Sequence, residues 1–327
     1  MATMNYSDAV SEALHRLQGV GFEHGPSFAN HAPMAAEALA RLGFADDVPA
    51  WVEQNLRQRR YLERPRPRWA LSAEDQADWA SALGDFSRVA DWCGLFDREL
   101  AELPWSQVLT TWWPRLLPGM SGVLTHGVIR TAHAVRALAE ASGDSRLQLG
   151  ELAQGLGYWA ARYSGPVPGE TQPAAAGAAE PDRPAEPAAA LAALDELIAD
   201  SAGGYVRTAP SFPVPLIHTI TGPAAVRLVC AHLPADQLWP SYLAARQTNA
   251  VMWSYFGGMA EPAGAGDQPR PPQPPALADL VGAAVELGDE HAIKLAEVAA
   301  RHHALAPDPR YALASQLATR QISRHPV

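Results

Sequence analysis

The stretch GVLTHGVIRTAHAVRALAEA, residues 122–141, decides the fold class of this chain. Its apolar residues recur every three or four positions, which is the period of an amphipathic α-helix. Gly143 follows where a helix of this kind commonly ends. The same period continues through most of the sequence on either side. We therefore expect further helices over residues 7–17, 33–42, 47–59, 72–90, 103–117, 147–163, 189–201, 222–233, 239–257, 277–286, 290–304 and 311–323.

Two details of this pattern concern helix starts and breaks. Ser72 and Asp75 form a capping pattern, which predicts that the helical stretch 72–90 begins there. Pro114 is expected to break the tryptophan-rich stretch 103–117, because proline has no N–H and clashes with the preceding turn.

Signals for strands are few. The sequence has few alternating runs of Val, Ile and Thr, and no Asn-Gly or Asp-Gly pair that would make a tight hairpin turn. Residues 23–32 are interpreted as a loop, and the apolar run 213–220 as separate from the helix over 222–233. The prediction is an all-α protein.

Two segments interrupt the helical pattern, residues 164–188 and 261–275. Both are rich in Pro, Ala and Gly and poor in large apolar residues, which is typical of flexible surface insertions. Candidate functional residues lie on both sides of each insertion. We therefore expect a single large helical domain over residues 1–327 rather than two separate domains.

Composition excludes several classes of protein. A chain of 327 residues with 48% hydrophobic residues can bury a sizeable core and is not disordered. Its net charge of −10 argues against binding nucleic acid, which needs clustered basic residues. Residues 1–11 lack the features of a signal peptide, and no apolar run approaches the length of a membrane span. We expect a cytoplasmic protein with no membrane or nucleic-acid partner, and its oligomeric state stays open.

Several familiar catalytic motifs are missing from the sequence. It contains no GxxxxGK[ST] loop, no GxGxxG after a strand, no GxSxG and no HExxH. The two cysteines, Cys93 and Cys230, form neither a disulfide framework nor a CxxC zinc motif. Histidine is the chemically versatile residue that remains.

Six histidines lie outside obviously solvated patches: His24, His31, His126, His133, His218 and His291. His126 and His133 share one helix face but are about 10 Å apart along its axis, an awkward separation for one ion. One of them is therefore a candidate ligand and the other a neighbour of the site or of the substrate. His291 and Lys294 are three residues apart, which places them side by side on a helix.

Lys294 is the only lysine among the 25 basic residues, and all the others are arginines. A GC-rich genome explains the replacement of Lys by Arg in general. Unlike Arg, a buried lysine can lose its proton and react, so the one that survives is a candidate for chemistry. The alternative is a helix-surface ion pair with Glu290, four residues earlier. The histidines, likewise, could be hydrogen-bonded core residues rather than ligands.

Aromatic residues provide a further candidate feature. They could line a pocket for a flat ligand or pack in the core. They are Trp105, Trp112, Trp113, Trp253, Tyr255 and Phe256.

Four sequence blocks, each centred on a histidine, occur in order along the chain. They are SFANHAPM (27–34) followed by ALARLG (38–43), THGVIR (125–130), LIHTITG (216–222) and DEHAIK (289–294). On these blocks the chain resembles the questin oxidase-like proteins, oxygenases known mainly from aromatic polyketide pathways. The resemblance covers most of the chain outside the two insertions.

The resemblance implies a mostly helical fold and a mononuclear non-haem Fe(II) centre. Its ligands would be His31, His126, His218, His291 and a CO₂-derived carbamate on Lys294. His24 and His133 match less firmly and would lie near the site rather than on the metal.

The implied reaction uses O₂, with an external reductant such as NADPH as a further expected cofactor. It is a Baeyer–Villiger-like C–C cleavage that opens a ring of an aromatic polyketide quinone or hydroquinone in secondary metabolism. His133, His24 or Tyr255 is the candidate catalytic base that removes a phenolic proton. Whether the enzyme is a mono- or a dioxygenase stays open.

Two other functions fit the same residues. A metal-dependent hydrolase could hold zinc or manganese with the same histidines and lysine. A helical binding protein for an aromatic metabolite would contain no metal and consume no oxygen.

Overall fold

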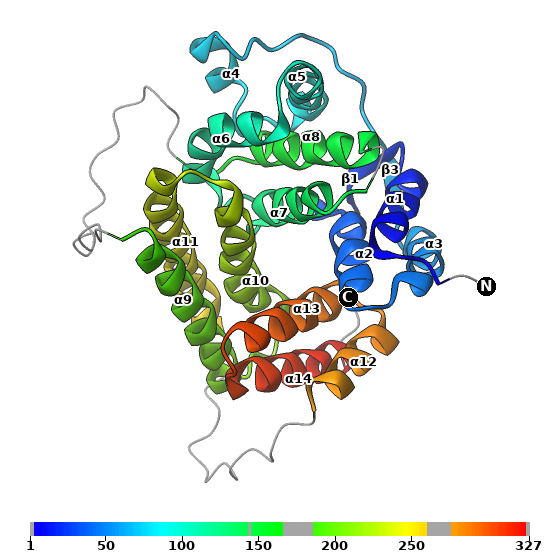
Figure 1. Cartoon of the computed structure of the whole chain (residues 1–327), viewed down its shortest axis with the longest axis vertical. Coiled ribbons are helices and arrows are strands. Elements are labelled where there is room, and N and C mark those ends of the chain that lie inside the picture. Colours follow the sequence, from blue (N-terminus) through cyan, green and yellow to red (C-terminus); the bar gives the residue numbers. More distant parts are fainter. Residues whose placement is uncertain (1–2, 143–144, 166–185, 260–275, 325–327) are drawn as a thin grey trace.

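The computed structural model describes residues 3–142, 145–165, 186–259 and 276–324 (Figure 1). It is 75% helical with 4% strand, which confirms the all-α prediction. The predicted insertions, 164–188 and 261–275, lie outside the described residues except for 164–165 and 186–188. The α-helices are α1 (Tyr6–Arg16), α2 (Ala32–Arg41), α3 (Val48–Gln58), α4 (Gln76–Ser81), α5 (Val89–Glu102), α6 (Trp105–Leu116), α7 (His126–Ala139), α8 (Arg146–Ala161), α9 (Ala188–Thr208), α10 (Pro213–Val229), α11 (Ala235–Phe256), α12 (Leu277–Leu287), α13 (Glu290–Leu305) and α14 (Pro309–Arg324).

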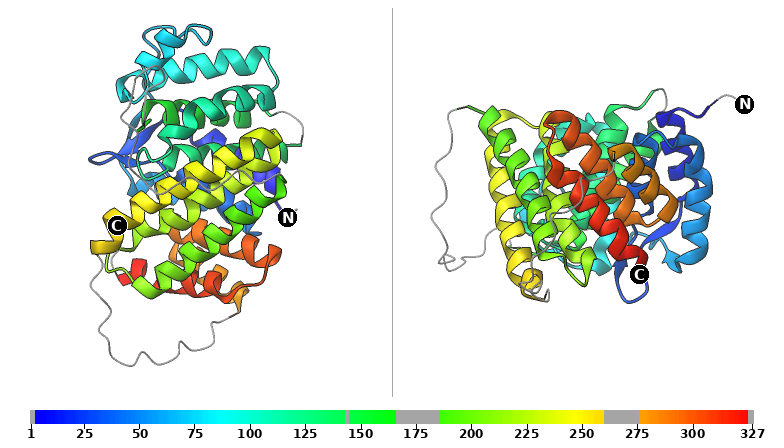
Figure 2. Two further views of the ribbon diagram at one scale, coloured as in Figure 1. Left: turned by 90° about the vertical axis from the view of Figure 1, so that its left-hand side faces the viewer. Right: turned by 90° about the horizontal axis from the view of Figure 1, so that it is seen from below.

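Four helices form a closed ring at the centre of the protein (Figure 1). Helix α2 packs against α7, α7 against α10, α10 against α13, and α13 back against α2. Outer helices cover each member: α1 and α3 cover α2, α8 covers α7, α9 and α11 cover α10, and α12 and α14 cover α13. Figure 2 shows the packed helices from two further directions. This ring places residues from four distant parts of the sequence next to one another.

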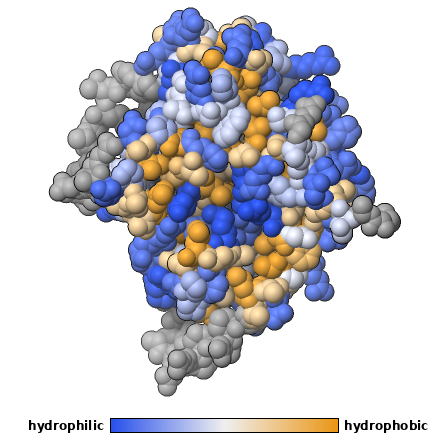
Figure 3. Space-filling view, viewed as in Figure 1, coloured by the Kyte–Doolittle hydropathy of each residue, from blue (hydrophilic) through white to orange (hydrophobic). Residues whose placement is uncertain are grey.

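Three apolar clusters stabilise the ring from outside. One joins α5, α6 and α8 to α7, one joins α9 and α14 to α10 and α13, and one joins α1 and α3 to α2. Burial of apolar surface is the main source of stability in each. The outer surface mixes hydrophobic and hydrophilic residues, as the face in Figure 3 shows.

Helix α10 is the most apolar member of the ring. The segment Pro213–His232 is long and apolar enough to cross a membrane, but 78% of its apolar window is buried inside the protein. A helix that is hydrophobic on all sides is expected when neighbours surround it. The prediction that 213–220 stands apart from a helix over 222–233 was wrong, because α10 runs unbroken through Pro223.

Two helix boundaries also differ from the prediction. The stretch 72–90 divides into α4, a 3₁₀ turn (Phe86–Arg88) and the start of α5, because the chain turns at Gly84 with φ +76°. Asp75 is the N-cap, and its side chain accepts hydrogen bonds from the backbone N–H groups of Ala77 and Asp78.

Pro114 does not break α6 as predicted. The missing N–H would leave the carbonyl of Thr110 without its helical partner. The side chain of Gln237 donates a hydrogen bond to that carbonyl at 3.0 Å. A contact from a distant helix therefore compensates for the proline.

A small antiparallel sheet replaces part of the predicted loop 23–32. Its strands are β1 (Val20–His24), β2 (Phe28–Ala29) and β3 (Tyr61–Glu63), in the order β2-β1-β3. The turn between β1 and β2 uses Gly25 and Ser27, both with positive φ. This sheet leads directly to His31 at the start of α2.

Candidate metal centre

Four buried histidines meet inside the helical ring, one from each of its helices. His31 is the N-cap of α2, His126 is the first residue of α7, His218 lies within α10 and His291 lies at the start of α13. Neighbouring ring centroids are 4.5 Å apart for His31–His126 and for His126–His218, 5.5 Å for His218–His291, and 4.4 Å for His291–His31. The four imidazoles therefore form a closed set around one point.

His126 and His218 direct their lone pairs at each other. Nδ1 of His126 contacts the carbonyl oxygen of Val123, and Nδ1 of His218 lies 2.9 Å from the carbonyl oxygen of Val214. A carbonyl only accepts, so each Nδ1 carries the proton and each neutral ring keeps its lone pair on Nε2. The two Nε2 atoms are 3.0 Å apart. Lone pairs this close repel each other unless a cation lies between them.

A proton is a poor candidate for that cation. Burial lowers the pKa of His31, His126 and His218 well below the usual value, and the nearby Lys294 lowers each further. The rings are therefore neutral at pH 7, which is the form that binds a metal. His31, His126 and His291 also each present a ligand atom within 4.8 Å of the others.

A strained turn positions His126. The preceding residues Val123, Leu124 and Thr125 have φ values of 46°, 53° and 67°. Positive φ is costly for side chains branched at Cβ, and such strain concentrates at functional sites. The turn brings the Val123 carbonyl to Nδ1 of His126, so the strain sets both the position and the protonation of this ring.

Asp289 orients His291. Its carboxylate lies 3.5 Å from Nδ1 of His291 and accepts backbone hydrogen bonds from residues 291 and 292 as the N-cap of α13. No closer hydrogen-bond partner for this Nδ1 occurs among the described residues. A carboxylate beside one ring nitrogen favours metal binding by the other.

Lys294 is buried beside the histidines, with 1% of its surface exposed. Its Nζ lies 3.2 Å from Nδ1 of His31. The predicted alternative, a surface ion pair with Glu290, is wrong, because that carboxylate binds Asn55 and Arg59 instead. Burial lowers the pKa of Lys294 to about 8, although Glu290 and Asp289 oppose the shift. About a tenth of this amine is therefore neutral at pH 7, far more than for an ordinary lysine.

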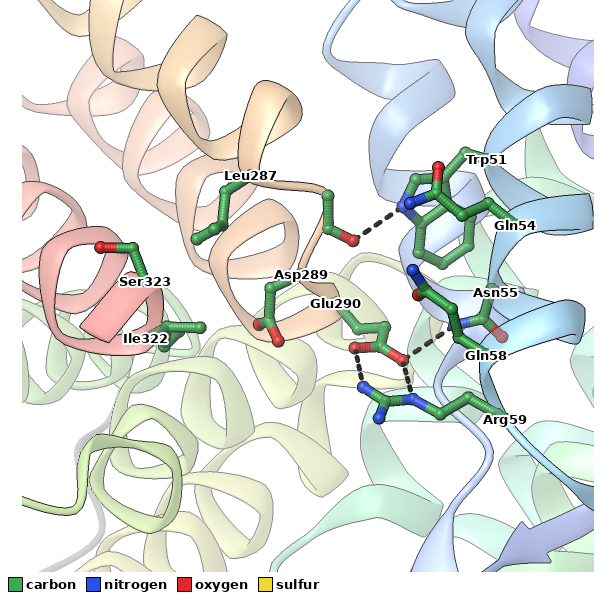
Figure 4. Close-up of a pocket in the computed structure, with 11 residues that line it drawn as sticks. Trp51, Gln54, Asn55, Gln58, Arg59, Leu287, Asp289, Glu290, Ile322 and Ser323 are labelled. Atoms are coloured by element: carbon green, nitrogen blue, oxygen red, sulfur yellow. Dashed lines mark hydrogen bonds and ion pairs between the residues drawn. The ribbon is translucent and has the colours of Figure 1, made fainter. Parts of the chain in front are cut away.

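A cavity of about 360 Å³ lies beside Asp289 and Glu290, at the start of the helix that carries His291 (Figure 4). It lies between α3, the start of α13 and the end of α14, and its walls include Trp51, Gln58, Asp289 and Glu290. Asp289 lines the cavity and also faces His291. Asp289 therefore links this cavity to His291.

His133 belongs to a second polar cluster, farther along the same helices. Its Nδ1 lies 2.5 Å from Glu37, which also binds Arg136 at 2.6 Å, and Arg136 binds Glu297 at 2.5 Å. These residues come from α2, α7 and α13, so the cluster links three helices of the ring. Arg136 lowers the pKa of Glu37 to about 2, against a burial effect that would raise it.

The other two candidate bases lie elsewhere. His24, at the end of β1, is half-buried, and its ring contacts Tyr61 edge-on. Burial and the positive charge of Arg59, which lines the cavity, lower the pKa of His24. Tyr255 is 63% exposed and packs on Phe256. This exposure does not favour Tyr255 as the base at a buried centre, and its role stays a prediction.

The predicted aromatic pocket is not formed as a unit. Trp112 and Trp113 are fully buried in the core beside α8, whereas Trp253 lines a separate cavity with Asn249. The core-packing alternative holds for the two buried tryptophans.

Sequence reasoning missed several residues that shape the centre. The N-cap position of Asp289 was readable from its place before a helical pattern. The Arg136–Glu37–Glu297 cluster and the carbonyls of Val123 and Val214 were not, because only the fold brings them into contact.

Comparison with protein-family models finds no match, and no curated protein matches the sequence. The arrangement of these side chains is therefore what supports a function for this chain.

Proposed function

We propose that the protein is a questin oxidase-like oxygenase with a mononuclear non-haem iron centre. His31, His126, His218 and His291 would bind Fe(II), together with a carbamate formed from Lys294 and CO₂. The observation that carries the proposal is the distance of 3.0 Å between the Nε2 atoms of His126 and His218, which both direct a lone pair into the space between them.

The donor set fits a first-row metal. Imidazole nitrogens bind Fe and Zn well, and an anionic oxygen completes a set that suits iron. The N-termini of α2, α7 and α13 also meet at this point, since His31, His126 and His291 lie at them. The partial positive charge of helix N-termini favours an anionic ligand such as a carbamate.

Lys294 has the properties that carbamate formation requires. A neutral amine adds CO₂ and releases a proton, whereas a protonated amine or a guanidinium does not. Burial keeps part of this amine neutral, as its pKa of about 8 indicates. This chemistry also explains why one lysine persists in a chain that otherwise uses arginine.

Iron bound here would supply the electrons that activate O₂ towards an aromatic polyketide quinone or hydroquinone. The protein's own residues would bind and orient that substrate in the cavity beside Asp289, where Gln54, Gln58 and Ser323 offer hydrogen-bonding groups. His24 is the better placed candidate to accept a phenolic proton, because Arg59 and Glu290, which influence its pKa, line that cavity.

Metal analysis tests the proposal. Protein purified without a His-tag or chelator should contain about one iron per chain, and Lys294→Ala should lose it. Oxygen uptake with quinones is then the assay of activity. Zinc in place of iron would contradict the oxygenase and favour a hydrolase at the same site. No metal in either protein would favour a helical binding protein.

A further inference from the structure

Arginines are unusually dense from the end of α3 to the segment that follows β3, residues 64–68. The segment RQRRYLERPRPR, residues 57–68, carries six of them in a chain whose net charge is −10. Of this segment, the proposed oxygenase chemistry uses only Gln58 and Arg59, which line the cavity beside Asp289. The fold gathers five of the six, Arg57, Arg59, Arg60, Arg64 and Arg66, around one open groove of about 750 Å³.

Most of this positive charge is not neutralised by the protein. Arg59 binds Glu290, and Arg57 has only the exposed Glu53 at 3.9 Å. Arg60, Arg64 and Arg66 form no ion pair with any residue of the described ranges. Glu63 is the acidic residue in the groove lining.

One guanidinium nitrogen is also buried without a partner. Nε of Arg64 is inaccessible to solvent and makes no hydrogen bond within the described part of the chain. The backbone N–H of Arg64 donates to the carbonyl of Gly19 at 2.8 Å, which joins the segment after β3 to the residue before β1. The arginines are therefore held on a defined backbone rather than on a free loop.

We propose that this groove binds a small organic diphosphate. Guanidinium groups present paired N–H donors that match phosphate oxygens, and three arginines without a close ion pair favour a ligand with more than one negative charge. The volume lies within the range of about 300–1,000 Å³ that is usual for small-molecule sites. The strongly acidic chain would repel a long polyanion such as nucleic acid.

The groove also provides an apolar contact for the organic part. Leu62 is 77% exposed and lines it together with Val20 and Leu56. The groove shares Arg59 with the cavity beside Asp289, so its ligand would lie next to that cavity. The proposal does not depend on iron or on oxygenase activity.

Calorimetric titration of the full chain with inorganic pyrophosphate and with ADP tests this site. We expect saturable binding of both, weakened by salt, with ADP the tighter ligand because of Leu62. Arg60→Ala/Arg66→Ala should weaken both by at least about tenfold, whereas Arg246→Ala, an exposed arginine on α11, should change them less than about twofold. Glu63→Gln should tighten both, because it removes the acidic group from the lining.

Three results would overturn the proposal. The first is that the native protein does not bind pyrophosphate. The second is that the double arginine variant binds pyrophosphate and ADP as tightly as the native protein does. The third is that Glu63→Gln binds them more weakly. Leu62→Ser should remove the advantage of ADP over pyrophosphate without affecting pyrophosphate itself. Equal native affinities for the two ligands would contradict the organic part of the assignment.

Discussion

Gly222 packs directly against Thr125, the residue before His126. A Cβ atom at position 222 would lie 2.9 Å from Oγ1 of Thr125. Gly222 is one helical turn after His218 in α10, and Thr125 ends the strained turn that leads into α7. This close approach of α10 to the start of α7 sets the separation of the two histidines.

Gly222→Ala should therefore weaken metal binding. The added methyl group pushes α10 away from Thr125, and we expect a loss of about tenfold in affinity for Zn²⁺ or Fe²⁺, or about 1.4 kcal/mol. Thr125→Ala makes room for the methyl group and loses no hydrogen bond, because Oγ1 of Thr125 has no partner among the described residues. The double variant should recover most of the affinity in a metal titration. Additive losses would contradict this account.

Metal ions should stabilise the native protein through the four histidines. A ligand that binds only the folded state at a hundred times its Kd adds about 2.7 kcal/mol, which calorimetry or thermal shift detects as a higher Tm. We expect His218→Ala to abolish the shift. His15→Ala, at an exposed position in α1, is the matched control and should keep it. An equal shift in both variants would place the metal elsewhere.

Lys294→Arg should abolish iron binding although it preserves the positive charge. A guanidinium does not form a carbamate, and its bulk and charge are unsuited to a site surrounded by neutral imidazoles. Iron content is measured by mass spectrometry, and activity by oxygen uptake. If the arginine variant retained both, Lys294 would not act through a carbamate.

Glu37→Gln should destabilise the protein in a pH-dependent way. The pKa of Glu37 is about 2 in the folded protein, below its ordinary value of 4.5. The stabilisation from this carboxylate is therefore present above about pH 4.5 and is lost as the pH falls towards 2, because the unfolded chain takes up the proton first. We expect a loss of about 3 kcal/mol at pH 7. Denaturant unfolding at pH 7 and at lower pH should show the difference between variant and native protein shrinking with acid, and a constant difference would refute it.

His24 and Tyr255 should respond differently to substitution. Tyr255→Phe should leave oxygen uptake unchanged, because the side chain is exposed to solvent whereas the histidines are buried. His24→Asn should lower the rate by about a hundredfold if this ring is the base, with unchanged iron content. Oxygen uptake over a pH series, compared with iron content, separates a proton-transfer role from loss of the centre. Full activity of His24→Asn would exclude the histidine as the base.

The helical class was predictable because helix formation is largely local. The period of residues 122–141 and the capping pattern of Ser72 and Asp75 before α4 follow from contacts within a few residues. The error at Pro114 arose because proline was taken as a helix break. For Pro114 a long-range contact, from Gln237 to the Thr110 carbonyl, compensates for the lost bond. The same limit explains the missed sheet, whose strands β1 and β3 are joined only by folding.

By itself, the sequence determined the all-α class and singled out the candidate residues, because side-chain type and the spacing of apolar residues can be read directly from it. It could not decide which histidines share a site. His31, His126, His218 and His291 are brought together by the ring of α2, α7, α10 and α13, while His133, on the same helix face as His126, belongs to the Glu37 cluster instead. Proximity across a fold depends on how helices pack, and packing is a property of the whole chain.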